Sequence, residues 1–305
     1  MKFKIILISV IVLAAAVLLG FNYAIKHVFP YSPIRPLRCN GDSFLTPKVA
    51  GLKWEPFNIT VEDSIKLIGW FIHSSVEPAK GTIFVLHGIG SCKAGMLTTA
   101  KLLADSGYNC VLYDQRASGE SGGINCTYGY YEKYDLSAYI DSTIKRYPGS
   151  GPYGIFGHSM GAAVSLQAME HDKRIKCGVA MSTFANLKQI VRDYFTRAAF
   201  KMDYIPDRAL TESEKIASFN ADSVSPVRSA KNITQPVLVI HGTKDDNISA
   251  KYGREVYNNL PSKDKEWYPV IGAMHNNIPV KGGDEWKRRV IAFFDKNLSE
   301  KSSSQ

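Results

Sequence analysis

Ser159 stands at the centre of the sequence GHSMG, residues 157–161, and its surroundings could make it a nucleophile. The residues before it, YGIF, are typical of a buried strand, and those after it, AAVSL, are typical of a helix. A strand that turns sharply into a helix strains the central residue, and flanking glycines leave room for the turn. The hydroxyl then projects above the sheet, near the positive end of the helix dipole. The pattern predicts attack by Ser159 on a carbonyl carbon.

A serine hydroxyl is a weak nucleophile at neutral pH and needs a histidine as base. We choose His275 from the seven histidines because it follows the last predicted strand, in the sequence GAMHNN. The other six flank the first apolar segment, follow or end a predicted strand or helix, begin a loop, or lie inside the serine turn. They are His27, His73, His87, His158, His171 and His241. The alternative for His275 is a surface loop histidine without a catalytic role.

The protonated imidazole needs a fixed carboxylate that holds its tautomer and stabilises its charge. The loop HGTKDD, residues 241–246, follows the preceding predicted strand and offers two candidates. We choose Asp245 and keep Asp246 in reserve, because neighbouring loop residues point in different directions. The alternative is that both residues only solvate the loop or cap the helix that begins near residue 250.

Acyl transfer also requires backbone amides that stabilise a negatively charged oxygen. The glycine-rich loop HGIGS, residues 87–91, follows a predicted strand, so we assign this role to the amides of Ile89 and Met160. A phosphate-binding loop is the rival interpretation of this segment. It is disfavoured because the loop lacks the G-K-[ST] ending and the required spacing.

Strands and helices must alternate to place these loops at one edge of a sheet. Apolar β-branched runs predict strands at residues 53–59, 66–72, 82–86, 110–113, 153–156, 178–181, 237–240 and 267–270. Helical periodicity lies between them, at residues 96–105, 133–146, 162–169, 250–260 and 285–297. This order predicts an α/β fold with a doubly wound, mostly parallel, eight-stranded sheet. The amphipathic residues 183–234 interrupt the rhythm and predict a helical lid insertion.

These motifs together resemble the α/β-hydrolase superfamily, over about residues 52–298. The resemblance consists of HG at residues 87–88, DQRASGES at residues 114–121, the serine turn, the GTKD loop and the final histidine. Nucleophile, acid and base occur in the family's chain order, and the chain looks most like ABHD-type and prolyl-oligopeptidase-like serine hydrolases, some of them membrane-anchored. Ala117 and Met274 stand where relatives usually have glycine, which puts the fine shape of the cleft in doubt.

Residues 5–24 carry no charge and are long enough to cross the roughly 30 Å of hydrocarbon in a bilayer. We expect residues 1–25 to be an uncleaved transmembrane anchor, with a cleaved signal peptide and a secreted protein as the alternative. Lysines and arginines flank both sides, so charge does not set the orientation. The very short segment ahead of the span favours a signal-anchor with an extracytoplasmic catalytic domain. The other expected regions are a stiff proline-containing linker at 26–50, a hydrolase domain at 51–298 and a polar tail at 299–305.

The net charge of +9 does not indicate nucleic-acid binding, because five positive charges and no acidic residue lie in residues 1–40. The excess of +4 that remains for the rest of the chain gives no basic stripe. Five scattered cysteines show no metal-ligand spacing, so no metal site and no disulfide framework are expected; one optional bridge, between Cys92 and Cys126, stays open. Oligomeric state stays open as well.

The expected reaction is hydrolysis of an ester, thioester or amide through an acyl-enzyme, without a cofactor. An apolar lid near a membrane favours an acyl substrate, hence a carboxylesterase, lipase or thioesterase. A peptidase of the prolyl-oligopeptidase-like type is one alternative. The other is a non-catalytic binding protein that has kept the fold. A missing serine, histidine or aspartate would favour this alternative, and none of the three is missing.

Overall fold

A computed structural model describes residues 2–39, 45–198 and 202–298. The polar tail at 299–305 and part of the linker lie outside these residues. The main sheet has eight strands in the order β1-β4-β6-β5-β7-β8-β9-β10. β1, β4 and β6 are antiparallel neighbours, and the remaining neighbours run parallel. The sequence-based prediction of a mostly parallel, eight-stranded α/β sheet is therefore confirmed.

The strands are β1 (Trp54–Pro56), β2 (Ile59–Thr60), β3 (Lys66–Leu67), β4 (Gly69–Ile72), β5 (Thr82–Leu86), β6 (Asn109–Tyr113), β7 (Tyr153–His158), β8 (Ile175–Met181), β9 (Val237–Gly242) and β10 (Glu266–Val270). The helices are α1 (Lys2–His27), α2 (Tyr31–Ile34), α3 (Leu97–Asp105), α4 (Glu132–Arg146), α5 (Met160–His171), α6 (Leu187–Arg197), α7 (Tyr204–Ala217), α8 (Pro226–Ala230), α9 (Ala250–Asn259) and α10 (Ile278–Leu298). Two short 3₁₀ turns are η1 (Lys93–Met96) and η2 (Ala221–Ser223).

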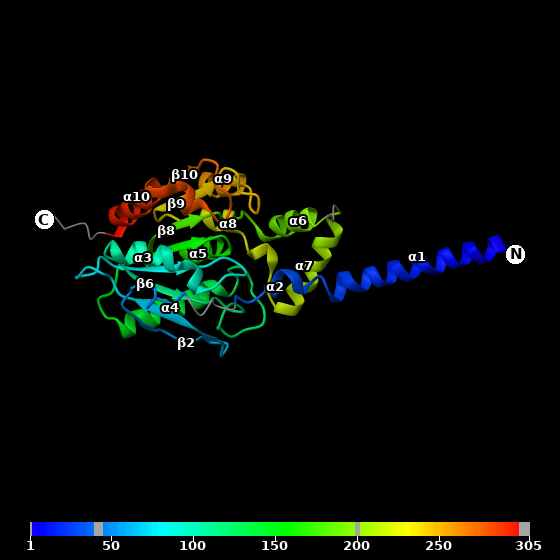
Figure 1. The fold of residues 1–305 in the computed structure, drawn as a ribbon, viewed down its shortest axis with the longest axis horizontal. Helices are drawn as coiled ribbons and strands as arrows, with labels where there is room; N and C mark the ends of the chain where they lie inside the picture. The colour runs from blue at the N-terminus through cyan, green and yellow to red at the C-terminus, as the bar shows by residue number, and fades with distance from the viewer. Residues whose placement is uncertain (1, 40–44, 199–201, 299–305) are drawn as a thin grey trace.

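Both faces of the sheet are covered by helices (Figure 1). Along β5, Ile83 and Val85 pack into the core on the α3 and α10 side, whereas Phe84 and Leu86 pack into the core on the α4 and α5 side. All four side chains are buried. This two-sided burial explains why the central strands are continuous apolar runs, and why a sequence without polar alternation still forms a sheet.

Two predicted strands are each broken once. The segment at 53–59 divides into β1 and β2, and the segment at 66–72 divides into β3 and β4, with β2 and β3 forming a separate two-stranded sheet. Side chains hold the break: the amide of Ile68 donates to Ser121 Oγ at 2.8 Å, and the amide of Gly69 donates to Asn58 Oδ1 at 3.1 Å. These long-range bonds replace ladder bonds, so local sequence could not reveal the break.

α10 begins seven residues earlier than the predicted helix at 285–297. Its first part is separated from the rest by Gly283, whose φ of +55° lies outside the helical region. Pro279, one residue into the first turn, is tolerated because the N–H it lacks would have no partner there. The glycines between the two parts masked the helical pattern in the sequence.

The insertion between β8 and β9 contains α6, α7, η2 and α8. α8 packs against α5 and belongs to the helical layer, whereas α6 and α7 pack against each other beside the domain (Figure 1). The part of the insertion that could act as a lid is therefore α6 and α7.

α1 projects away from the domain and meets it beside α7 (Figure 1). The apolar side chains along α1 are exposed, whereas Ile25 near its end is buried. Ser213 Oγ of α7 donates to the carbonyl of Pro30 at 2.6 Å, and the ring of Phe29 contacts that of Phe195 at 6.1 Å between centroids. Phe29 and Pro30, near the start of the predicted linker at 26–50, are therefore packed onto the domain.

The candidate disulfide between Cys92 and Cys126 is wrong. Cys92 is bonded to Cys39, and Cys126 is a buried free thiol whose Sγ lies 3.6 Å from the carbonyl of Pro33. Cys126 faces the segment around α2, whereas the linker brings Cys39 to the start of η1. The bridge thus joins the linker to the loop that follows β5.

Candidate active site

The turn between β7 and α5 holds Ser159 in an unusual backbone conformation. Its φ of +57° and ψ of −120° are costly for a residue with a side chain, and the amide of Ser159 donates to the carbonyl of Met181 at 2.8 Å. A Cβ on Gly157 would lie 2.3 Å from the carbonyl oxygen of Gly161. Only glycine fits at this close approach, so the sequence GHSMG produces the sharp turn that it predicted.

Ser159, His275 and Asp245 form a continuous hydrogen-bonded row. His275 Nε2 lies 2.9 Å from Ser159 Oγ, and His275 Nδ1 lies 2.8 Å from Asp245 Oδ2. Ser159 and His275 are only 5 % and 7 % exposed, and the Asp245 side chain is buried. The structure therefore brings together three side chains that are far apart in the sequence, in the geometry that base-assisted attack by a hydroxyl requires.

The Asp245 carboxylate is held by several donors. Burial alone would raise the pKa of Asp245, but hydrogen bonds from His241, from His275 and from the amide of Ile248 hold it well below its usual range. Asp245 Oδ1 accepts the Ile248 amide at 2.8 Å, and His241 Nε2 lies 3.3 Å from Oδ2. The carboxylate is thus ionised at neutral pH and can stabilise a positive charge on His275. The reserve candidate Asp246 is exposed, and its carbonyl accepts a hydrogen bond from Arg197.

The loop between β5 and η1 carries Ile89 beside Ser159. Because the Gln115 amide donates to His87 Nε2 at 3.0 Å, the hydrogen of this imidazole is on Nδ1, which donates to the Gly88 carbonyl at 2.7 Å. Burial lowers the pKa of His87, which keeps the ring neutral. In a trans peptide unit the N–H points opposite to the carbonyl, so His87 fixes the direction of the Ile89 amide. Met160 begins α5, so its amide has no partner within the helix.

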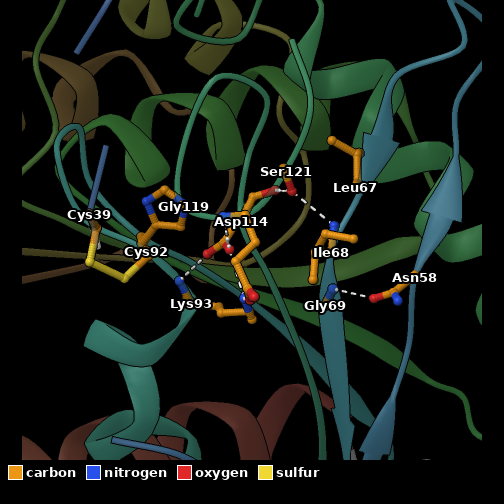
Figure 2. Close-up of polar contacts among 12 residues, drawn as sticks. Cys39, Asn58, Leu67, Ile68, Gly69, Cys92, Lys93, Asp114, Gly119 and Ser121 are labelled. Carbon is orange, nitrogen blue, oxygen red and sulfur yellow. Dashed lines mark hydrogen bonds and ion pairs between the residues drawn. A yellow bond between two sulfur atoms is a disulfide. The ribbon is translucent and has the colours of Figure 1, made fainter. Parts of the chain in front are cut away.

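A buried ion pair fixes the other end of this loop (Figure 2). Asp114 accepts hydrogen bonds from the amide and the Nζ of Lys93, both at 2.7 Å, and from the amide of Glu120 at 2.9 Å. The disulfide of Cys92 lies directly beside Lys93 (Figure 2). The motif at 114–121 therefore holds η1 in place. Sequence reasoning missed Lys93 because a lone lysine in a loop gives no sign that it is buried.

A cavity of about 460 Å³ opens above Ser159. Gly88, Ile89, His158 and His275 line it near the hydroxyl. Sequence reasoning also missed its outer wall, which includes Tyr194 of α6 together with Asn247, Thr98, Pro279 and Val280. These residues belong to no recognisable sequence motif. Tyr194 reaches the cavity only because the insertion between β8 and β9 folds back beside it.

The comparisons with known proteins agree with this fold. A family model described as "Serine aminopeptidase, S33" matches residues 77–225. The esterase Pf2001 of Pyrococcus furiosus superposes with a TM-score of 0.73 at 28 % identity, over 88 % of this chain and 99 % of the esterase. The chain belongs to the α/β-hydrolase superfamily. It is a hydrolase by fold and by relationship.

Curated relatives of this hydrolase include proteins of similar length and larger ones. The uncharacterised protein YqkD of Bacillus subtilis is 28 % identical over 227 residues, which cover 73 % of this chain and 74 % of YqkD. The lysophosphatidylserine lipase ABHD12 of Macaca fascicularis is 24 % identical over 194 residues, which cover 62 % of this chain and 47 % of the lipase. An acylaminoacyl peptidase of Pyrococcus horikoshii shares the fold, with a TM-score of 0.63 at 20 % identity.

His158 of this hydrolase supports His275 rather than Ser159. Burial, and then the neighbouring His275 imidazole, lower the pKa of His158 to about 4. The neutral ring can donate from Nε2 to the His275 carbonyl, 3.1 Å away. The sequence placed His158 beside the nucleophile, and the structure shows that it braces the backbone of the loop carrying His275.

We expect His158 to make the folded state sensitive to acid. An unfolded histidine binds a proton below about pH 6.5, whereas folded His158 resists until about pH 4, so folding stability falls as the pH falls between these values. The loss between pH 7 and pH 5 amounts to about 2 kcal/mol, which lowers the melting temperature by several degrees. In His158→Gln this part of the stability loss between pH 7 and pH 5 should be absent. Fluorescence melting of the full-length protein at both pH values measures it.

The control for this experiment is His171→Gln, which alters an exposed histidine at the end of α5. This variant should keep the wild-type difference between pH 7 and pH 5. If His158→Gln also keeps the full difference, burial of neutral His158 is not the source of the acid sensitivity.

Proposed function

We propose that this hydrolase cleaves a carboxylic ester or thioester through an acyl-enzyme on Ser159. The observation that carries the proposal is the hydrogen-bonded row of Ser159, His275 and Asp245, with distances of 2.9 Å and 2.8 Å. The relationship to an esterase and a lipase supports an acyl substrate. The strained backbone of Ser159 supports a catalytic role, because strain of this kind is concentrated at functional sites.

In the proposed mechanism, His275 Nε2 accepts the hydroxyl proton while Ser159 Oγ attacks the carbonyl carbon. The amides of Ile89 and Met160 donate hydrogen bonds to the oxyanion of the tetrahedral intermediate. His275 then returns the proton to the leaving alcohol or thiol, and the carbonyl reforms as the acyl-enzyme. A water molecule attacks this acyl group, again losing a proton to His275, and the carboxylic acid leaves as Ser159 regains its proton. Asp245 holds the imidazole tautomer throughout.

A peptidase or amidase is the second candidate. The matched family description names a serine aminopeptidase, and the same row of side chains can attack an amide. The difference lies in the leaving group, because an amine must be protonated before it departs. A non-catalytic binding protein is the third candidate. Binding alone would not require the strained backbone at Ser159.

A substrate panel tests the proposal on the full-length protein in a non-ionic detergent. The panel contains p-nitrophenyl butyrate, a butyryl thioester and aminoacyl p-nitroanilides. We expect turnover of the ester and thioester, with kcat/KM for the anilides lower by about a hundredfold or more, equivalent to about 3 kcal/mol of transition-state stabilisation. Faster cleavage of the anilides would favour the peptidase, and no turnover of any substrate would contradict the proposal.

We propose further that α1, within residues 1–25, anchors this domain as a single-pass helix with the domain on the extracytoplasmic side. Among the described residues, α1 is the one helix long and apolar enough to span a membrane. Its 26 residues extend about 39 Å at 1.5 Å per residue, more than the roughly 30 Å hydrocarbon core. The disulfide of Cys39 and Cys92 supports an oxidising compartment. A secreted protein after signal cleavage is the alternative.

The position of the domain can be tested with protease added to intact cells or spheroplasts. We expect the domain to be degraded without lysis and the intact protein to sediment with membranes. Protection until lysis would place the domain in the cytoplasm. A soluble form lacking residues 1–24 would support signal cleavage.

A further inference from the structure

A second cavity of about 690 Å³ adjoins the active-site cavity. The two share three wall residues: Thr98, Pro279 and Val280. From this shared wall the second cavity continues along α3 towards Asp105. Leu97 and Asp105, at the two ends of α3, both line it, so the second cavity follows the helix for about 12 Å. We call it the α3 groove.

The walls of the α3 groove are mainly hydrocarbon. They comprise Leu45 and Val49 of the linker, Leu97 and Leu102 of α3, and Trp286 of α10. The lysines at its edge are paired with neighbouring carboxylates: Lys101 with Asp105 at 2.9 Å, and Lys287 with Asp284 at 2.7 Å. No unpaired charge among these residues demands a charged ligand, so the chemistry of the groove favours an apolar one.

The described residues leave parts of this apolar wall open to solvent. Val49 of the linker is 70 % exposed and Val280 of α10 is 84 % exposed, and both line the groove. Single exposed apolar residues are common, but a cluster of them around a cavity marks a binding surface. Since Thr98, Pro279 and Val280 line both cavities, the groove lies directly against the cavity over Ser159.

We propose that the α3 groove binds the acyl chain of the substrate. The carbonyl lies at Ser159, and the hydrocarbon passes Thr98 and Val280 and continues along α3 between Val49 and Trp286. This inference rests on the proposed ester or thioester hydrolysis and specifies its substrate as a medium- or long-chain acyl compound. A peptide is a poorer fit, because the walls supply few groups that could pair with its backbone amides. The leaving group then lies on the side of Tyr194 and Asn247.

Chain-length dependence tests this proposal in the full-length protein at one fixed concentration of non-ionic detergent. Each buried methylene is worth about fourfold in kcat/KM, so p-nitrophenyl laurate should be hydrolysed more efficiently than the butyrate. Val49→Asp and Val280→Asp should each lower the laurate-to-butyrate ratio of kcat/KM by about tenfold or more, since loss of only two buried methylenes gives about sixteenfold. Both residues are exposed, so neither change is expected to disturb folding.

The matched control is Ile124→Asp. Ile124 is 70 % exposed, like Val49, and lies outside the α3 groove. It should keep the wild-type ratio. The proposal is overturned if the ratio is unchanged in both groove variants, or if it falls equally in Ile124→Asp.

A labelling experiment separates failure of the groove from failure of the proposed hydrolysis. Palmitic acid bearing a photoreactive diazirine is irradiated with full-length Ser159→Ala, and labelled peptides are mapped by mass spectrometry. We expect label on peptides from 97–105 and 278–287, reduced at least several-fold by Val49→Asp, while label on the detergent-bathed α1 stays constant. This result would support acyl-chain binding in the α3 groove even if no ester were cleaved. Label confined to α1, or a dimer that shields the groove from label, would overturn the proposed binding.

Discussion

Ser159→Ala is expected to lower kcat for p-nitrophenyl butyrate by about a hundred-thousand-fold to a million-fold, the range expected when a serine hydrolase loses its nucleophile. Alanine has no Oγ to attack the carbonyl or to give a proton to His275 Nε2, 2.9 Å away. The hydrogen bond from the backbone amide of Ser159 to the carbonyl of Met181 does not involve the side chain, so the turn should persist. Initial rates with the butyrate measure the loss of activity. Labelling by a fluorophosphonate probe, followed by intact-protein mass spectrometry, measures the expected loss of labelling.

Ser91→Ala is the control for loss of a hydroxyl from the same cavity. Ser91 lines the cavity on the loop after β5, and it makes no hydrogen bond to His275 in the structure. We expect this variant to retain activity within a few-fold and to label normally. If Ser159→Ala labels as wild type does, or if both variants lose activity equally, Ser159 is not the nucleophile.

Asp245→Asn is expected to lower kcat by about ten-thousand-fold, as replacement of the orienting carboxylate does in serine proteases. An asparagine that offers its amide N–H to His275 Nδ1 stabilises the tautomer with the hydrogen on Nε2, which cannot accept the proton of Ser159. It also removes the charge that stabilises the imidazolium. Its remaining oxygen can still accept the Ile248 amide, so the loop should keep its shape. Steady-state kinetics with a parallel thermal melt would separate loss of activity from unfolding.

Asp246→Asn provides the matched control, because it makes the same chemical change at the adjacent residue. The Asp246 side chain is exposed, and the contact with Arg197 uses only its backbone carbonyl. Activity within twofold of wild type is expected. A large loss in Asp246→Asn together with near-normal activity in Asp245→Asn would show that the reserve candidate is the acid.

Short contiguous motifs in the sequence predict which residues form the candidate site. The turn around Ser159 is specified by residues 157–161, and a parallel sheet brings the loops after its strands to one edge. That edge unites Ser159 with Asp245 and His275, although more than 80 residues separate the serine from either partner. The order of strands thus carried more information than the loop sequences alone.

Features that depend on long-range packing could not be predicted. The partner of Cys92 is set by the path of the linker, which no local pattern encodes, and so Cys39 was missed. The burial of Lys93 follows from Asp114 reaching it across the sheet edge, 21 residues away in the chain. The early start of α10 was hidden because Gly282 and Gly283 interrupt the helical periodicity.

Ala117 shows how a departure from the superfamily pattern is accommodated. Its φ of +60° lies in the left-handed region, where relatives usually place glycine. The methyl group costs about 1 kcal/mol there, an amount that a domain with this extensive a core can carry. The departure therefore alters local strain and leaves the reacting groups in place.

The contact between the base of α1 and α7 has a consequence for how the enzyme meets its substrates. Ile25 is buried and the Pro30 carbonyl accepts a hydrogen bond from Ser213, so the domain is held against the end of α1 by direct contacts. With α1 in a bilayer, the depth of its apolar stretch would set the height of the cleft above the lipid headgroups. Adding one helical turn to that stretch would shift the cavity over Ser159 by about 5.4 Å along the helix axis. The distance from which the domain can contact a substrate would change by the same amount.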